Sequence, residues 1–313
     1  MEPKKNDIAG LSQILVSPMN GVRKKPVHSL SFDVEEHFQV SAFWSEARRC
    51  QWDQLESRVE SNTKRITDIL AQNNTRATFF VLGWVAERHP SLVKDLASEG
   101  HEIASHGYGH ELVSAQTPDQ FRRDVRKAKS ILEDLTGKPI IGYRAPSFSI
   151  TTETLWALSI LVEEGHLYDS SIYERFRRFN RAVGHETHYS IDTSADRIVE
   201  VSPSTLKVCG VQLPVAGGGY FRLFPYAASR MFLRQLEKRG VQLVMYVHPW
   251  EIDPDQPRMK GPLLSRFRHY INLHKTADRL KCLLHDFRFA PIREVIGLMT
   301  RMCRERAGAL GRR

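Results

Sequence analysis

The sequence predicts an α/β fold in which short parallel strands alternate with helices. Apolar runs of strand length, such as ATFFVLG at 77–83, are separated by stretches with helical periodicity and helix-capping signals. This alternation is typical of β-α-β units that build a parallel sheet or a barrel. The 313 residues contain no internal repeat and no low-complexity linker, so one main domain is expected.

Strands are expected where apolar runs end in turn residues or charged residues. The first begins at Val27, and residues 1–26 show no periodic pattern and are interpreted as an N-terminal extension. The segments predicted as strands, some with their exit loops, are VHSLSFDVEEHF (27–38), ATFFVLG (77–83), HEIASH (101–106), KPIIGYRAPSF (138–148), LYDSSI (167–172), RIVEVS (197–202), VQLPV (211–215) and VQLVMYVHPW (241–250). FRFAPIREVIGLM (287–299) is expected to add a last strand and helix.

Helices are expected between these strands. The clearest begins after Thr117, where a proline and then Gln120 complete a capping box, and it ends at Gly137. Further helices are predicted over 57–70, through Leu92 to Gly100, from Leu155 to Gly165, over 224–240 and from Thr276, as the cap, to Phe287. The segment from Pro254 to Tyr270 is expected to be a polar loop.

Composition limits the class of protein. The 41% hydrophobic content is enough for a sizeable core, but no run approaches the roughly 18 apolar residues of a transmembrane helix. The N-terminus lacks the apolar segment of a secretory signal. Four cysteines without CxxC spacing are compatible with a reducing compartment. These features together predict a cytoplasmic protein.

The net charge of +9 lies largely in a few places, above all in the tail RMCRERAGALGRR (301–313). A basic tail could bind an anionic membrane face, which would give a peripheral membrane association, or could simply be solvated. The sequence shows no nucleic-acid-binding module and no basic stripe interleaved with aromatic residues, so nucleic acid is not expected as a partner. Nothing in it defines an oligomeric state.

Polar side chains suited to catalysis or metal binding follow most of the predicted strands. They are Asp33, Glu35, His106, His110, Arg144, Asp169 and His248. The carboxyl ends of parallel strands meet at one face of an α/β barrel, where active sites are built. Because buried charges without partners are costly, convergence on one site would also supply these groups with partners.

The segment SHGYGH (105–110) holds two histidines four residues apart. On a helical turn this spacing would put His106 and His110 on one side, within reach of a single divalent metal. Alone the pair is weak evidence, because surface helices acquire such spacings by chance. With carboxylates at neighbouring strand ends it predicts a metal site.

The motifs FDVEE, SHGYGH, YRAPSF and VHPWE follow one another in the chain. In this combination the chain resembles the NodB-type polysaccharide deacetylases, carbohydrate esterase family 4. GGGYFRLFP and RFRHYINLHKTADRLKCLL resemble, more narrowly, the branch found in bacterial exopolysaccharide loci with exosortase-type sorting systems. The resemblance implies a distorted, seven-stranded (β/α) barrel over 27–300, including a family-specific C-terminal extension from about residue 254, with the basic tail 301–313 beyond it.

The resemblance also implies catalytic roles. Asp33 matches the general base that acts on a metal-bound water, and His248 matches the acid that protonates the leaving amine. Arg144 would orient Asp33 and keep it ionised, and Asp169 would help to fix that arginine or the wall of the site.

The implied metal site departs from the family pattern at one ligand. His106 and His110 match the two histidine ligands, but Val34 stands where the family has a ligating aspartate. Glu35 or Glu36 must then take that role. Strand alternation puts Asp33 and Glu35 on one side, so Glu35 is the predicted third ligand. The implied cofactor is a divalent ion, with Zn²⁺ as the first choice.

The implied reaction removes an N-acetyl group from an amino sugar of an exopolysaccharide or of its lipid-linked precursor. Substrate contacts are assigned to Tyr143, Pro146, Tyr220 and Trp250, and Arg222 could also meet the glycan. Two alternatives stay open. One is an amidohydrolase of cyclic amides on the same scaffold, which would not require the metal; the other is a catalytically silent glycan-binding module.

Overall fold

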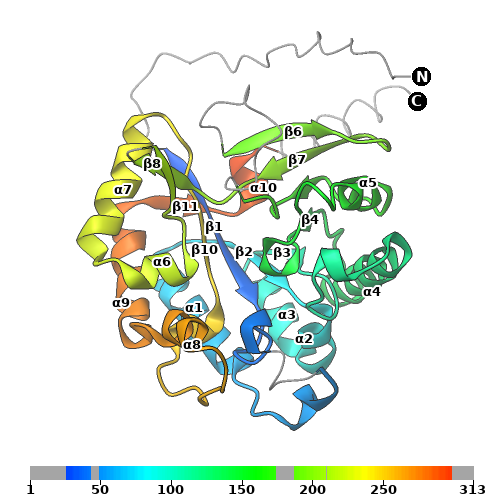
Figure 1. The fold of residues 1–313 in the computed structure, drawn as a ribbon, viewed down its shortest axis with the longest axis horizontal. Coiled ribbons are helices and arrows are strands. Elements are labelled where there is room, and N and C mark those ends of the chain that lie inside the picture. Colours follow the sequence, from blue (N-terminus) through cyan, green and yellow to red (C-terminus); the bar gives the residue numbers. More distant parts are fainter. Residues whose placement is uncertain (1–25, 44–48, 174–186, 209, 298–313) are drawn as a thin grey trace.

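The computed structural model describes residues 26–43, 49–173, 187–208 and 210–297 (Figure 1). The basic tail lies outside these residues, as does the N-terminal extension apart from Pro26. The domain limits at 27 and 300 and the role of the basic tail therefore stay predictions.

A curled sheet of parallel strands forms the centre of the protein (Figure 1). Its order is β10, β1, β2, β3, β4, β5 and β7, and every neighbouring pair in this order is parallel. These strands are β1 (Val27–Val34), β2 (Thr78–Val81), β3 (Glu102–Ser105), β4 (Gly142–Tyr143), β5 (Tyr168–Asp169), β7 (Arg197–Val201) and β10 (Val244–Val247). β6 (His188–Asp192) adds an antiparallel edge to β7, and β11 (Arg288–Ala290) pairs in parallel with the start of β1.

Among the described residues, β7 and β10 form no strand ladder with each other. Loop backbone joins these two ends of the curled sheet instead. The backbone N–H of Ser204 donates to the Val244 carbonyl at 3.2 Å, and that of Tyr246 donates to the Ala216 carbonyl at 2.9 Å. Gly217 forms a single bridge with Tyr246. Nearby, β8 (Thr205–Val208) and β9 (Val211–Pro214) form a separate antiparallel pair. The predicted α/β class is confirmed, and the distorted barrel is an open one.

Helices lie around the outside of the curled sheet (Figure 1). They are α1 (Val59–Gln72), α2 (Gly83–Arg88), α3 (Pro90–Ser98), α4 (Pro118–Thr136), α5 (Trp156–Glu163), α6 (Gly218–Leu223), α7 (Tyr226–Lys238), α8 (Leu263–Tyr270), α9 (Leu273–Asp286) and α10 (Ile292–Val295). The predicted capping box of α4 is present, because Thr117 and Gln120 bond reciprocally, and Gly137 ends the helix with φ of 63°. None of the described helices is long and apolar enough to cross a bilayer.

Two predictions about the C-terminal region are wrong. The expected loop over 254–270 contains the helix α8, and Thr276 does not cap α9, which begins three residues earlier at Leu273. Thr276 is buried inside α9, where its hydroxyl donates to the Asn272 carbonyl at 3.3 Å. A threonine hydroxyl can bond to the preceding turn of a helix as well as to its first turn, so the residue type alone did not define the helix start.

One apolar core joins the N-terminal strands to the C-terminal helices. Phe32 on β1 and Phe79 on β2 are fully buried and stack with ring centroids 5.1 Å apart. Leu280 and Leu283 on α9 belong to the same apolar cluster. Since β10 and β11 also pair with β1, the C-terminal region shares the sheet and the core of the N-terminal region.

Candidate active site

A pocket of about 180 Å³ lies at the carboxyl ends of the central strands. Five of the seven polar residues predicted for the site line it, namely Asp33, Glu35, His106, His110 and His248. Arg144 is fully buried and bonded to Asp33, and neither Arg144 nor Asp169 lines the pocket. The convergence of strand-end polar groups predicted from the sequence therefore occurs.

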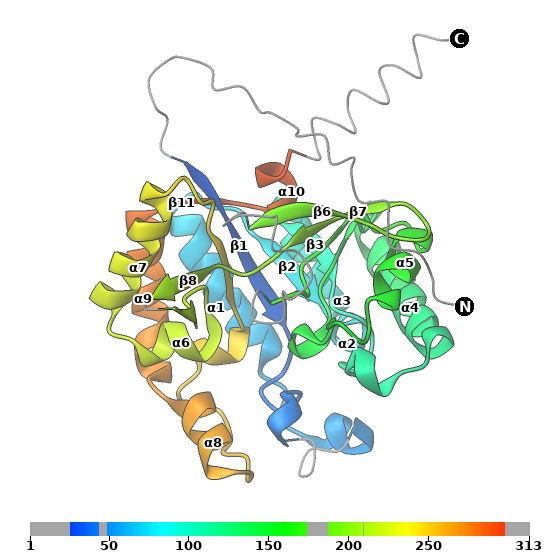
Figure 2. The same cartoon turned by 45° about the horizontal axis from the view of Figure 1, so that its top comes forward.

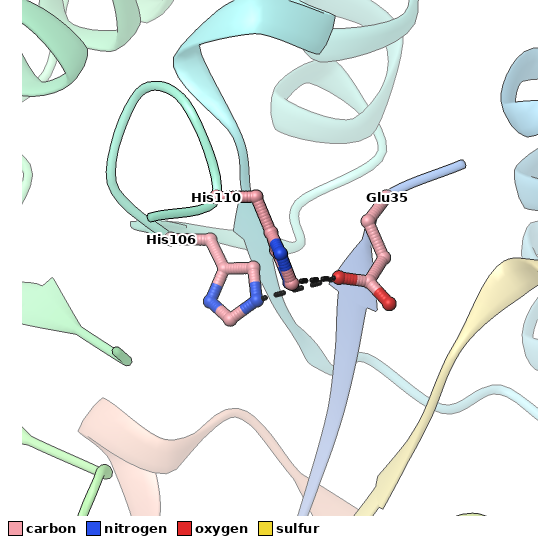
Figure 3. Close-up of side chains that lie close together, drawn as sticks. All are labelled: Glu35, His106 and His110. Carbon is pink, nitrogen blue, oxygen red and sulfur yellow. Dashed lines mark ion pairs between the residues drawn. The ribbon is translucent and has the colours of Figure 1, made fainter. Parts of the chain in front are cut away.

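Glu35, His106 and His110 form a cluster in which one potential ligand atom from each lies within 4.8 Å of the others. Figure 3 shows the Glu35 carboxylate, just after β1, facing the two imidazoles. Glu35 Oε2 lies 2.6 Å from His110 Nε2 and 3.8 Å from His106 Nε2, and all three side chains are buried. Two imidazoles and one carboxylate are a ligand set that suits a divalent ion with open coordination positions.

The two histidines lie in a loop after β3, so the predicted helical turn is wrong. Gly107 has φ of 74° and His110 has φ of 51°, both in the left-handed region, which breaks any helix between them. Asp124 on α4 holds this loop by accepting hydrogen bonds from the backbone of Tyr108 and Gly109 at 2.8 and 3.2 Å. The loop still directs both imidazoles toward Glu35.

The hydrogen bond of His106 defines which of its ring nitrogens can bind a metal. Nδ1 lies 2.8 Å from the backbone carbonyl of Arg144, and a carbonyl oxygen can only accept. Nδ1 therefore carries the proton, and Nε2, which faces Glu35, is left with its lone pair. This arrangement fits the ligand role predicted for His106.

Electrostatics favour an ionised carboxylate at Glu35. Burial alone would raise the pKa of Glu35, but the charges of His110 and His248 and the side-chain contacts with His106 and His110 outweigh it and hold that pKa well below its ordinary value. Glu36, in contrast, accepts hydrogen bonds from the backbone N–H groups of Arg58 and Val59 at the start of α1. Only Glu35 lies with the histidines, as predicted.

Arg144 holds Asp33 in position through a direct ion pair. Its Nη1 donates to Asp33 Oδ1 at 2.6 Å and lies 2.9 Å from Ser31 Oγ. Its Nη2 donates to Ser170 Oγ at 2.8 Å and its Nε to the Ser170 carbonyl at 3.2 Å. The guanidinium is thus fixed by four polar contacts, and Asp33 Oδ2 is turned toward the pocket side, 3.7 Å from His248 Nε2.

His248 has a buried acidic partner that sequence reasoning missed. Its Nδ1 lies 2.6 Å from Glu251 Oε1, and Glu251 Oε2 accepts from Arg222 Nε at 2.7 Å. Burial opposes protonation of His248, but the hydrogen bond to Glu251 and the charges of Glu35, Glu251 and Asp33 raise its pKa to about 9. Glu251 stands in the VHPWE motif, so its spacing of three from the histidine was the available signal.

Asp169 has no direct contact with Arg144 and acts on the adjoining backbone through Ser171. Its carboxylate accepts from Ser171 Oγ at 2.5 Å, and Ser171 Oγ accepts from the Ala145 N–H at 2.7 Å. Burial raises the pKa of Asp169 to about 6, and burial beside Asp169 raises that of Glu200 well above its ordinary range. Asp169 therefore braces the loop behind the site through Ser171.

The predicted substrate contacts divide into two pairs. Trp250 lines the pocket, and both Trp250 and Tyr220 line an adjoining groove of about 520 Å³. Tyr143 and Pro146 are buried and line neither space; Tyr143 packs edge-on against Phe121 instead. The pocket and the groove share three lining residues, which are Val40, Tyr246 and Trp250.

Arg222 lines the groove beside Tyr220 and Trp250, but its guanidinium already has partners within the protein, so its contact with a glycan stays a prediction. Its guanidinium is nearly fully buried, pairs with Glu251 and donates from Nη1 to the His269 carbonyl at 2.6 Å. The imidazole of His269 stacks on Trp250 with ring centroids 4.1 Å apart. Arg222 thus joins α6, the VHPWE segment and α8.

Two family models match the chain on either side of residue 165. A model described as polysaccharide deacetylase matches residues 24–161, and a domain of unknown function, DUF3473, matches residues 170–297. The first span holds Asp33 and the predicted metal ligands, and the second holds His248 with Glu251. The pocket is therefore built from both matched spans.

Similar curated proteins match about a third of the chain. A peptidoglycan-N-acetylglucosamine deacetylase of Bacillus cereus is 40% identical over 96 residues, which are 30% of this chain and 35% of that protein. A peptidoglycan deacetylase of Helicobacter pylori is 31% identical over 113 residues, 36% of this chain and 38% of that protein. The matches span little more than a third of the length of these relatives.

A solved structure from Mycobacterium smegmatis, of a protein assigned as a polysaccharide deacetylase, has the same fold. The superposition covers 92% of this chain and 94% of that chain, with a TM-score of 0.60 and 21% sequence identity. The likeness therefore extends through the C-terminal region as well as through the central strands.

Proposed function

We propose that the protein is a metal-dependent N-deacetylase of amino sugars, starting from the match of residues 24–161 to a polysaccharide deacetylase family model. The reaction would release acetate and leave a free amine on the sugar. One observation carries the proposal: the cluster of Glu35, His106 and His110 lies in the same pocket as the Asp33–Arg144 pair and His248. Ligands, base and acid would then surround one acetamide group.

The donor set fits a divalent ion held by Glu35 Oε2, His106 Nε2 and an imidazole nitrogen of His110. When bound, such an ion would polarise the substrate carbonyl and make water a better nucleophile near neutral pH. Zinc suits two imidazoles and a carboxylate, so Zn²⁺ is the ion we propose.

The residues of the chain would divide the proton transfers between them. Asp33 Oδ2 would accept a proton from the attacking water as the new carbon–oxygen bond forms, and Arg144 keeps that carboxylate oriented. His248 Nε2 would donate a proton to the amide nitrogen as the carbon–nitrogen bond breaks. The raised pKa of His248 supports this role, because it favours the protonated ring that a proton donor requires.

The substrate is proposed from the motifs of the sequence together with the form of the site. The similarity of GGGYFRLFP and the 266–284 segment to the exosortase-associated branch favours an exopolysaccharide or its lipid-linked precursor. The aromatic pair Tyr220 and Trp250 in the adjoining groove could stack on a sugar ring. A cytoplasmic location of the enzyme is part of the same proposal.

Acetate release tests this function. The protein would be incubated with chitooligosaccharides and with a lipid-linked N-acetylhexosamine, with and without chelator, beside Asp33→Asn and a control, Asp134→Asn, on the exposed face of α4. We expect release that chelator and Asp33→Asn abolish and Asp134→Asn leaves unchanged.

Other outcomes would identify the alternatives. Turnover of cyclic amides that survives chelation would indicate the related amidohydrolase. Sugar binding without turnover, unaffected by Asp33→Asn, would indicate a silent glycan-binding module. No acetate from any acetylated sugar would reject the proposed reaction.

A further inference from the structure

The helix α8 presents an uncovered apolar edge beside the site. Leu263, Leu264 and Phe267 are 81%, 60% and 56% exposed, whereas most large apolar side chains of the described chain are buried. Figure 2 shows α8 projecting from the body of the protein at its lower left. At about 100° per residue, these three side chains occupy a single arc of the helix surface. We call these three residues the α8 edge.

The segment that carries the α8 edge is basic in sequence. Residues 256–277 contain no aspartate or glutamate but five lysines and arginines: Arg258, Lys260, Arg266, Arg268 and Lys275. Arg266 and Arg268 are exposed, and the helical spacing places them on opposite sides of the apolar arc. An apolar strip with cationic side chains on both flanks is the pattern of helices that lie in a membrane interface.

The opposite side of α8 is held firmly to the protein. His269 stacks on Trp250, and its Nε2 lies 2.7 Å from Gln256 Oε1. At the C-terminal end of α8, beside the edge itself, the Tyr270 hydroxyl accepts from the Met259 N–H at 2.6 Å. The apolar edge therefore cannot fold back onto the core without breaking these contacts. The position of α8 therefore keeps this edge exposed.

We infer that the α8 edge docks on the surface of an anionic phospholipid bilayer. Leu263, Leu264 and Phe267 would enter the boundary between headgroups and acyl chains, while Arg266 and Arg268 would meet lipid phosphates. A second copy of the chain fits this edge less well, because a twofold contact would bring two sets of basic residues together. The inference goes beyond the proposed function and does not depend on it.

Docking at this edge would place the pocket close to the membrane. Trp250 stacks on His269 of α8 and also lines the pocket. Leu264 and Phe267 of the α8 edge line the adjoining groove, so a bilayer at this edge would lie on the same side of the protein as the groove. A sugar carried on a lipid anchor could then reach the site without leaving the membrane surface.

Vesicle binding of the full chain tests the inference. Vesicles would contain phosphatidylcholine alone or phosphatidylcholine and phosphatidylglycerol in equal parts. We expect sedimentation with the anionic vesicles only. Arg266→Glu with Arg268→Glu should weaken this binding more than about 20-fold, since each basic residue near an anionic surface contributes about fivefold. Leu263→Glu with Phe267→Glu should weaken it by at least about tenfold.

Matched variants separate the α8 edge from net charge and from general apolar exposure. Arg65→Glu with Arg123→Glu makes the same charge change at exposed positions of α1 and α4, and Met231→Glu changes an apolar side chain of α7 that is 60% exposed. Both should bind like the unchanged protein, and circular dichroism should show all variants folded.

Three outcomes would overturn the inference. Equal binding to both kinds of vesicle would remove the charge argument, and binding that survives both α8 variants would place the contact elsewhere in the chain. A dimer in ultracentrifugation that only the α8 variants dissociate, without vesicle binding, would make the edge a self-interface. Because vesicle binding is measured without substrate, failure of the deacetylase proposal would leave the result intact.

Discussion

Glu35 Oε2 lies 2.6 Å from His110 Nε2, although the two residues come from different strand ends. Val34 is fully buried in the core, whereas the side chains on either side of it, Asp33 and Glu35, both reach the pocket. Alternation at the end of β1 thus separates the apolar position from the two acidic ones. Glu35, two residues after Asp33, therefore faces the same pocket as Asp33 and lies beside His110.

Glu35→Gln should remove tight binding of a divalent ion. The amide keeps the shape of the side chain but loses the charge, so affinity should fall by more than about 100-fold, beyond the effect typical of outer-shell partners. Glu36→Gln is the matched control, because Glu36 bonds to the backbone at the start of α1. Titration calorimetry with Zn²⁺ would measure both. If Glu36→Gln lost the metal and Glu35→Gln kept it, the ligand assignment would be wrong.

Sequence patterns predicted the site better than its surroundings. The ends of β1, β3 and β10 follow from apolar runs that stop at polar residues, and parallel strands bring such ends together. The helical turn between His106 and His110 was wrong because glycine permits left-handed backbone and Asp124 on a distant helix fixes the loop. Spacing alone does not distinguish these two ways of bringing two histidines together.

The helix α8 and the burial of Tyr143 depended on contacts that are remote in sequence. Leu263–Tyr270 lacks a buried apolar stripe, and His269 packs instead on Trp250, nineteen positions away, which no local pattern reveals. Tyr143 directly precedes Arg144, but β4 turns its ring into the core beside Phe121. Both errors arise where tertiary packing outweighs local periodicity.

Arg144→Met should destabilise the protein strongly. The change leaves Asp33 buried without its partner, and breaking a buried ion pair in this way costs about 3–5 kcal/mol. Urea unfolding would measure the free energy. Arg197→Met is the control, because its pair with Asp192 is exposed and its loss should change stability little. A similar loss of unfolding free energy in both variants would contradict a large contribution of the buried Arg144–Asp33 pair to stability.

Gly217→Ala should disturb the closure of the sheet beside the pocket. Gly217 has φ of 151°, and a Cβ atom there would lie 1.9 Å from the Tyr246 carbonyl oxygen. We expect a loss of about 2 kcal/mol or more in unfolding free energy. Gly219→Ala, in the same glycine run, meets nothing nearer than 3.8 Å and should be tolerated. Equal stability of both variants in thermal unfolding would show that the backbone around Gly217 relaxes to accommodate the added Cβ atom.

Glu251→Gln should move the alkaline limb of the pH–rate profile to lower pH. His248 has its pKa raised to about 9, so its acidic form persists below that pH and is lost above it. Removing the charge of Glu251 removes one of the interactions that raise this pKa, and the limb should shift down by about one unit or more. A divalent ion bound by Glu35 would offset the charge of the Glu35 carboxylate and so lower the pKa of His248. The unchanged protein and Glu251→Gln should therefore be compared at the same metal concentration.

Glu60→Gln, beside the distant His89, is the matched control and should leave the alkaline limb in place. If Glu251→Gln left the pH–rate profile unchanged, the group that titrates in the alkaline limb would not be a His248 paired with Glu251.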